Sequence, residues 1–331
     1  MASRQQKRTF TFLYFPFFVA VVFSKSYPWL PLPAFVECIL FQMTTIPESY
    51  SAPSIRYKNR HYKRCCDSPF VIWFRERSGS SYMCSLLHSH PEILCRREDF
   101  DLIRMEDVPN DSDEDLTDND VFRFKDRFYH RQFKGFKNEV VDNPTPQQTV
   151  AHMRRIMSQP RKACGFKFKF DIQVASYPEI VDELHWLSRQ VRIVLMTRED
   201  FLKQAVSRQN MERIQLTQNK ANLGKGKRSL PPIELDVPRA MHYAERFMMG
   251  NERFLNSVAN FAHVRKVVYE NLLSDPHHEV REVLKFLGVD PDRELGATIR
   301  KATPDRLSEA VKNFDELSAA VAGTALEAFL D

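Results

Sequence analysis

The chain has 331 residues, 43% of them hydrophobic, which is enough for one large α/β domain or two smaller domains with a packed core. Its net charge of +5 is unevenly distributed, because residues 1–67 hold nine Lys/Arg and three Asp/Glu whereas the remainder holds 39 and 40. Residues 68–331 therefore lack the basic excess typical of nucleic-acid-binding domains, and we expect no nucleic-acid partner.

Residues 1–43 begin with a basic tail and continue into a hydrophobic segment. The charge-free stretch 10–23 is shorter than the roughly 20 residues that a membrane-spanning helix needs. Apolar residues continue to position 41, and a basic start before a short apolar core also resembles a signal peptide. A membrane anchor formed by residues 10–41, a cleaved signal and a disordered extension all remain open. Residues 44–67 are expected to form a linker or stalk.

Residues 68–331 alternate between apolar runs of strand length and segments with helical periodicity. The near-continuous apolar character of 191–197 is typical of a strand in a buried parallel sheet. This alternation predicts an α/β fold: a P-loop-like, doubly wound parallel sheet flanked by helices, with its ligand at the carboxyl ends of the strands. Strands are predicted at 70–74, 163–170, 191–197 and 264–269, and helices at 79–90, 177–188, 200–213 and 276–287.

The segment between the first predicted strand and the first predicted helix has the composition of a phosphate-binding loop. A glycine-containing turn at a helix N-terminus offers free N–H groups and the positive end of the helix dipole. Here a guanidinium and three hydroxyls are added to these groups, in the order Arg77-Ser78-Gly79-Ser80-Ser81. The Gly-Lys-Ser/Thr ending of nucleoside-triphosphate loops is missing, so the loop suits a single phosphate. The competing interpretation is a well-capped helix without a ligand.

A second anion-binding element is predicted after the strand 191–197. Arg198 follows the carboxyl end of this strand, and Ser207 comes nine residues later in the next predicted helix. A guanidinium and a hydroxyl in this arrangement can bind one phosphate together. Taken alone, the pair is better explained as a surface arginine and a helical serine. Together with the first loop, it predicts a nucleotide with phosphates at both ends.

These two elements resemble those of sulfotransferases that use 3′-phosphoadenosine 5′-phosphosulfate (PAPS), and most closely the Stf0-like branch of carbohydrate and trehalose sulfotransferases. The resemblance covers roughly residues 68–315 and implies PAPS as the sulfonate donor, with no metal. It assigns the 5′-phosphosulfate to Arg77, Ser78, Gly79, Ser80 and Ser81. The motifs that carry it are 77–81 with Cys84, Glu98-Asp99-Phe100, Arg198 with 204–207, and the late segments 269–273 and 286–289.

The resemblance further assigns the 3′-phosphate to Arg198 and Ser207, and the base that deprotonates the acceptor to Glu98. It implies a hydroxyl of a carbohydrate or another hydroxylated small molecule as the acceptor. Arg77 is expected to stabilise charge on the leaving oxygen. Glu98 comes soon after the first helix, where the chain should return to the ligand-binding edge. Three histidines remain rivals for the role of base, because other sulfotransferase branches use histidine: His88, His90 and His130.

Two other functions remain open beside the sulfotransferase. One is a small-molecule kinase with a degenerate phosphate loop, and the other is an inert, membrane-tethered nucleotide-binding protein. The six cysteines show no paired metal-ligand spacing, in agreement with a metal-free site. If residues 1–43 anchor the chain, the resemblance implies a Golgi or other secretory-pathway membrane with a lumenal catalytic domain; otherwise the protein would be cytoplasmic. The oligomeric state is left open.

Overall fold

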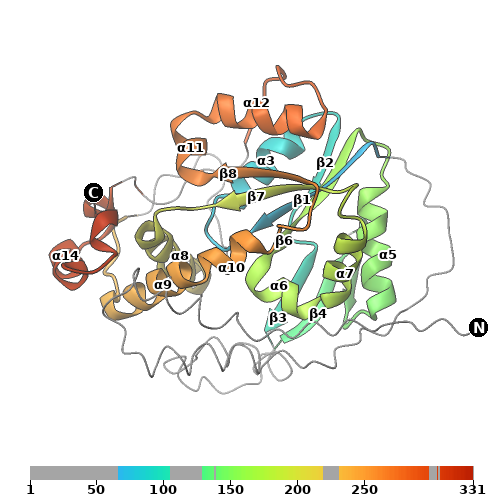
Figure 1. Ribbon diagram of the computed structural model, residues 1–331. Helices are drawn as coiled ribbons and strands as arrows, with labels where there is room; N and C mark the ends of the chain where they lie inside the picture. The colour runs from blue at the N-terminus through green and yellow to red at the C-terminus, as the bar shows by residue number, and fades with distance from the viewer. Residues whose placement is uncertain are drawn as a thin grey trace, which may run out of the picture. The chain divides into compact units, whose positions relative to one another are not determined.

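Five strands form the central sheet, in the order β2-β6-β1-β7-β8 (Figure 1). The computed structural model describes residues 66–104, 129–137, 139–218, 231–297, 304 and 306–330, all within the second of two units of the chain, Tyr62–Asp331. All four strand pairings are parallel, which confirms the predicted fold class. The strands are β1 (Ser68–Phe74), β2 (Ile93–Arg96), β6 (Ala163–Lys169), β7 (Arg192–Thr197) and β8 (His263–Val268).

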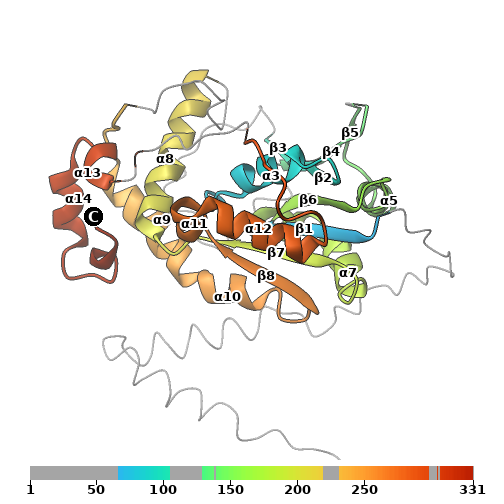
Figure 2. The same ribbon diagram turned by 90° about the horizontal axis from the view of Figure 1, so that it is seen from above.

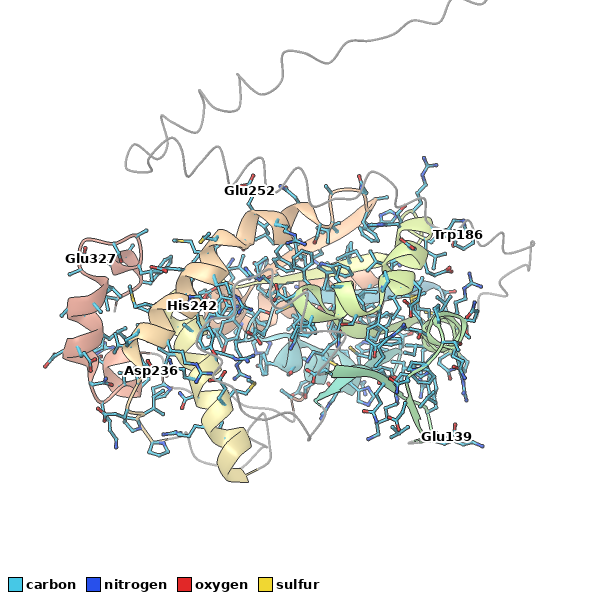
Figure 3. The ribbon with its side chains drawn as sticks, turned by 90° about the horizontal axis from the view of Figure 1, so that it is seen from below. Glu139, Trp186, Asp236, His242, Glu252 and Glu327 are labelled. Atoms are coloured by element: carbon cyan, nitrogen blue, oxygen red, sulfur yellow. The ribbon has the colours of Figure 1, made fainter. Side chains whose placement is uncertain are left out.

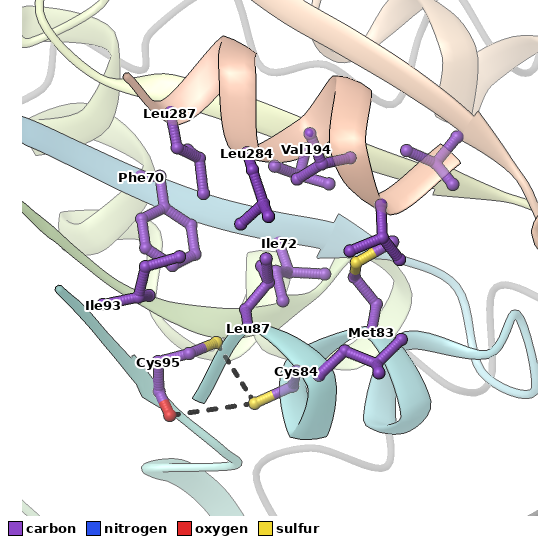
Figure 4. Packing of buried hydrophobic residues seen from close by; sticks show 14 of the residues in the cluster. Phe70, Ile72, Met83, Cys84, Leu87, Ile93, Cys95, Val194, Leu284 and Leu287 are labelled. Carbon is purple, nitrogen blue, oxygen red and sulfur yellow. Dashed lines mark hydrogen bonds between the residues drawn. The ribbon is translucent and has the colours of Figure 1, made fainter. Parts of the chain in front are cut away.

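One face of this sheet packs against three helices that surround a continuous apolar core (Figures 1 and 2). Alternate residues of β1 point to opposite faces, and Phe70, Ile72 and Phe74 point to this one. Figure 4 shows Ile72 beside Leu87, with Cys84 and Cys95 at the edge of the cluster. The helices are α3 (Ser80–Ser89), α11 (Tyr269–Ser274) and α12 (Pro276–Leu287).

The opposite face forms a second core, rich in aromatic side chains. Val71 and Trp73 of β1 point into it, and the Trp73 ring centroid lies 5.5 Å from that of Phe168. A capping box formed by Thr145 and Gln148 begins α5. The helices on this face are α5 (Pro146–Met157), α6 (Phe170–Ser176), α7 (Pro178–Trp186) and α10 (Asn251–Asn256).

A second, antiparallel sheet of three strands was not predicted. Its order is β3-β4-β5, and Phe100 and Phe133 pack from it into the second core. The charged and polar residues of β4 hide the usual strand pattern in the sequence. The strands are β3 (Phe100–Arg104), β4 (Tyr129–Lys134) and β5 (Val140–Asp142).

A third apolar cluster forms where α8 packs on α9 and on the C-terminal segments. Asp236, labelled in Figure 3, caps α9 by accepting a hydrogen bond from the Arg239 N–H. No helix within the described ranges is both long and apolar enough to cross a membrane; the proposed anchor at 10–41 lies outside these ranges, as does the linker up to residue 65. The helices are α8 (Phe201–Gln218), α9 (Val237–Met249), α13 (Leu307–Ala310) and α14 (Phe314–Val321), followed by a 3-10 helix, η2 (Glu327–Phe329).

The boundaries of two predicted strands were wrong at their carboxyl ends. Phe170 and Tyr269 were each predicted to end a strand, but each begins a short helix, α6 and α11 respectively. The helix predicted at 276–287 has those bounds, and Gly288 ends it with φ of 73°, the left-handed conformation that glycine adopts without penalty. The strand-to-helix transition at Tyr269 brings its ring to the carboxyl edge of the sheet, where the candidate site lies.

Candidate functional site

The loop between β1 and α3 lies at the carboxyl edge of the sheet. Because β7 is the neighbour of β1, Arg198, which follows β7, lies beside this loop. Gly79 caps α3, and the first bonds of this helix run from the Tyr82 and Met83 N–H groups to the Gly79 carbonyl. The N–H groups that precede them have no acceptor within the helix and are available to an anion. The backbone therefore forms the predicted glycine turn at a helix N-terminus.

Gly79 is required in this turn for two reasons. Its φ of +79° disfavours residues with a side chain, and a Cβ placed there would lie 2.3 Å from Tyr269 Cδ2. The Tyr269 ring in turn lies beneath the Arg198 guanidinium, with 4.8 Å between Cζ and the ring centroid. The Tyr269 ring thus packs against both Gly79 of the loop and the Arg198 guanidinium, a role that the sequence did not reveal.

Gly79→Ala is therefore expected to lower both stability and donor binding. Alanine in the left-handed region costs about 1–2 kcal/mol, and the Tyr269 ring must also move. We expect Tm, measured by circular dichroism, to fall by at least ~4 °C, as a loss of 2 kcal/mol implies for a domain of this size. Gly296→Ala is the matched control, because a Cβ at Gly296 meets no atom within 4 Å. Equal Tm values for the two variants would contradict this account of the turn.

Arg77 connects the two predicted elements. Its Nε donates to Ser207 Oγ at 2.9 Å, and its carbonyl accepts from Arg198 Nη1 at 3.0 Å. Its backbone is left-handed, with φ of 59°, although it is not glycine. Such a conformation costs about 1–3 kcal/mol and is typical of functional sites whose surroundings hold it in place. The structure thus brings together Arg77, Arg198 and Ser207, as predicted from the two separate motifs.

The electrostatics of this pair of arginines favour an anion between them. Burial, followed by the nearby charge of Arg198, lowers the pKa of Arg77 to about 10. Burial also lowers the pKa of Arg198. Two partly desolvated guanidinium groups repel each other, and a bound phosphate would neutralise both.

Orphaned polar atoms mark the same position. The Ser78 side chain is buried, and its Oγ has no hydrogen-bond partner among the described residues. Arg198 Nε, 3.7 Å from Glu270 Oε1, is likewise buried and makes no hydrogen bond there. Buried donors of this kind are costly unless a ligand or water satisfies them. The residues present therefore fit a ligand that carries phosphate groups.

Helix α8 holds the loop in this conformation. Gln204 Nε2 donates to the Glu76 carbonyl at 2.6 Å, and Arg208 forms an ion pair with the Glu76 carboxylate. Burial acts to raise the pKa of Glu76, but the positive charges around it, led by Arg208, lower it below its ordinary value. Gln204, Ser207 and Arg208 lie three and four residues apart, on one helix face. That spacing was the available sequence signal for Gln204 and Arg208, which were not predicted as site residues.

Ser207→Ala should weaken donor binding more than it slows catalysis. The Ser207 hydroxyl accepts from Arg77, so its own hydrogen is free for a phosphate oxygen. We expect the Kd for 3′-phosphoadenosine 5′-phosphate (PAP), measured by titration calorimetry, to rise roughly 10-fold, as the loss of about 1.5 kcal/mol for a charge-assisted hydrogen bond implies. Ser158→Ala, at an exposed helix end, is the control. An unchanged Kd would remove Ser207 from the donor site.

Glu98 lies between β2 and β3 and reaches the same loop through a lysine. Its Oε1 is 2.7 Å from Lys167 Nζ, which also lies 2.8 Å from Ser81 Oγ. The positive charge of Lys167 lowers the pKa of Glu98 despite the opposing effect of burial, so the carboxylate is ionised at neutral pH. The carboxylate is also partly exposed, at 47% of its side-chain surface. An ionised and accessible carboxylate can accept a proton from an approaching hydroxyl.

The rival histidines are less well placed for this role. His90 is buried, with Nε2 3.1 Å from the Asp290 carbonyl and Nδ1 accepting from the Glu92 N–H, so both ring nitrogens have partners. His88 is exposed at the opposite end of α3 from the loop. The His130 side chain lies outside the described residues. Of the described candidates, only Glu98 contacts a residue that binds the loop.

A buried ion pair unforeseen from the sequence supports the segment around Glu98. Asp99 Oδ2 accepts from Arg96 Nε at 2.8 Å and lies 3.1 Å from His152 Nε2. The His152 ring stacks on Phe133, with 4.3 Å between ring centroids. Helix α5 and strand β4 thereby hold the residue next to Glu98. Across the described part of the chain, no three His, Cys, Asp or Glu side chains gather as a metal site would require.

The sequence matches known proteins over most of this domain. Nodulation protein H of Rhizobium tropici is 25% identical over 263 residues, covering 77% of this chain and 90% of that protein. Nodulation protein H of Rhizobium meliloti is also 25% identical over 263 residues, covering 75% and 89%. Among solved structures, a sulfotransferase from Alicyclobacillus acidocaldarius aligns with a TM-score of 0.37 and 17% identity, over 79% of this chain and 98% of that one. The sequence pattern of the sulfotransferase family matches residues 69–293, so the chain belongs to the sulfotransferase family.

Proposed function

We propose that this enzyme transfers the sulfonate group of PAPS to a hydroxyl of a carbohydrate or another hydroxylated small molecule. The observation that carries the choice of donor is the junction of the two anion-binding elements at Arg77. Its backbone belongs to the loop at the start of α3, and its guanidinium contacts Ser207 of α8. A donor with phosphate groups at both ends matches this arrangement.

In this proposal, the loop binds the 5′-phosphosulfate. The free N–H groups at the start of α3 and the hydroxyls of Ser78, Ser80 and Ser81 surround the phosphate. Arg198 and Ser207 bind the 3′-phosphate, and Tyr269 holds the Arg198 guanidinium in place through its ring. Arg77 lies between the two groups and contributes charge to both.

The chemistry that PAPS supplies is a sulfonate group on a phosphate leaving group. Its transfer requires in-line geometry and stabilisation of the charge that develops on the leaving oxygen, as in phosphoryl transfer. The α3 N–H groups and Arg77 are held in place by the fold before the reaction begins, so that they can stabilise this charge as it develops. Glu98 accepts the proton of the acceptor hydroxyl. The assigned residues therefore account for donor binding, leaving-group stabilisation and deprotonation.

The direct test combines donor binding with turnover. We expect PAP to bind the purified full-length chain in titration calorimetry, without Mg²⁺. Transfer of radiolabelled sulfonate from PAPS should then be measured on a panel of sugars and oligosaccharides that includes trehalose. Mg²⁺-dependent binding and turnover of ATP, with no PAP binding, would instead support the small-molecule kinase.

A further inference from the structure

Lys167 is a buried cation in the middle of the central sheet. It lies on β6, which is paired with a neighbouring strand on each side, and its side chain is only 2% exposed. The parallel register places Lys167 opposite Ile72, so both side chains point to the face covered by α3. A buried ammonium is costly unless its donors are satisfied. Its position therefore calls for an explanation beyond packing.

The partners of Lys167 are the predicted donor loop and the predicted base. Nζ donates to Ser81 Oγ at 2.8 Å and to Glu98 Oε1 at 2.7 Å. It also lies 4.7 Å from the centroid of the Phe74 ring, at the end of β1. Glu98 follows β2 and Ser81 lies in the first turn of α3, so the Lys167 side chain connects two segments that approach the site from different strands.

The chemistry of an ammonium group dictates what each contact does. An ammonium only donates, so Ser81 Oγ must accept, and the hydroxyl hydrogen of Ser81 is left for another acceptor. Ser81 stands among the first residues of α3, where the free N–H groups lie. On the other side, Lys167 binds Glu98 through Oε1, which leaves Oε2 for the acceptor hydroxyl. Lys167 thus orients a donor toward the phosphate site and a carboxylate oxygen toward the acceptor.

We propose that Lys167 is a positioning residue that couples the donor loop to the base, by orienting Ser81 and by holding the Glu98 carboxylate in place. The inference rests on the proposed function, because it needs Glu98 to act as base. Lys167 itself exchanges no proton with the acceptor. Its effect on the rate passes through Glu98, and its effect on donor binding passes through Ser81.

The charges around Glu98 allow this to be tested by pH. The titratable or charged groups that face it are Lys167 and Lys169 from β6, Arg77 from the loop and the Cys84 thiol from α3. Lys167 is first among the causes that lower the pKa of Glu98, and burial opposes it. Without Lys167, burial remains and the largest opposing charge is lost, so the pKa of Glu98 must rise. The pH below which kcat/KM falls should rise together with this pKa, because a protonated Glu98 cannot accept a proton.

The experiment measures kcat/KM against pH for Lys167→Met, using PAPS and the best acceptor of the sugar panel. We expect the acidic limb to move to higher pH by about 1–3 pH units, the usual effect of an adjacent opposite charge. Lys167→Arg, which keeps a cation, should leave the limb where it is in the wild type. Lys162→Met is the matched control, since Lys162 precedes the same strand at its opposite end and is 43% exposed. Circular dichroism at each pH confirms that the variants are folded.

A double-mutant cycle then separates positioning from general destabilisation. Lys167→Met should slow kcat roughly 10- to 100-fold in the wild-type background, up to the lower range for general base catalysis. In the Glu98→Gln background, where no base remains to be positioned, the same change should cost far less. An equal cost in both backgrounds, an unmoved limb in Lys167→Met, or a moved limb in Lys167→Arg would overturn the inference. Absence of PAP binding and of turnover in the wild type would instead overturn the proposed function.

Discussion

Arg77→Ala is expected to abolish sulfonate transfer and to weaken PAP binding roughly 100-fold, as the loss of about 3 kcal/mol for hydrogen bonds to a charged group implies. Arg77 belongs to the first predicted anion element and contacts the second, through its Nε to Ser207 and through its carbonyl to Arg198. Arg77→Ala keeps the carbonyl but removes the guanidinium, and with it the positive charge that the proposal places between the two phosphate groups. Titration calorimetry with PAP and transfer of radiolabelled sulfonate measure the two effects.

Two further variants separate charge from geometry at this position. Arg77→Lys keeps the charge but loses the planar fork, and should recover part of the PAP affinity with less of the rate. Arg281→Ala is the control for loss of an exposed arginine, because its ion pair with Asp292 lies on the surface of α12. Near-normal PAP affinity in Arg77→Ala would remove the loop from the donor site and leave the proposal without its main support.

Glu98→Gln is expected to slow transfer at least ~100-fold while PAP binding is retained. The substitution preserves size and removes the negative charge that accepts the acceptor proton. It also leaves the buried Lys167 ammonium without its carboxylate, so we expect a lower Tm as well. Single-turnover kinetics measure the transfer rate, titration calorimetry measures the PAP affinity, and circular dichroism measures Tm.

A matched substitution tests whether the position or the chemistry matters. Glu92→Gln makes the same change just before β2, at the opposite end of the strand from Glu98, where Glu92 pairs loosely with Lys162 at 3.6 Å. This variant should transfer sulfonate at the wild-type rate. A fully active Glu98→Gln would eliminate Glu98 as the base and return the role to a histidine, with His130 as the next to be tested.

The elements closest to the donor site could be predicted because their signals are local. A buried strand, a glycine turn and a helix are contiguous in 70–90, and so are a strand end and a helix in 191–207. The physics of such segments depends on neighbours in sequence: free N–H groups at a helix start, and side chains at a strand end. Their placement on one parallel sheet was predicted, and the order β6-β1-β7 shows that the two strands are also neighbours.

The residues that were missed depend on contacts between segments far apart in the chain. Lys167 reads in the sequence as the polar position of an alternating strand, whereas in the structure the packing of α3 buries the face of β6 on which it lies. Tyr269 reads as the end of a strand, and Gln204 as an ordinary polar residue of a helix. Each contacts the donor loop across more than 80 positions of sequence, and of the three only Gln204 had a local signal, its spacing from Ser207 and Arg208 on one helix face.

The amino-acid sequence by itself determined the fold class, the glycine turn before α3 and the positions of Arg198 and Ser207 after a strand and on the next helix, because strand burial, helix capping and turn geometry are properties of short segments. Only the tertiary structure decided that Arg77 joins the two elements, that Tyr269 packs against both and that Lys167 ties Glu98 to Ser81. The reason is that the cost of a buried charge or an orphaned donor depends on which distant groups surround it, and these become neighbours only when the sheet is assembled.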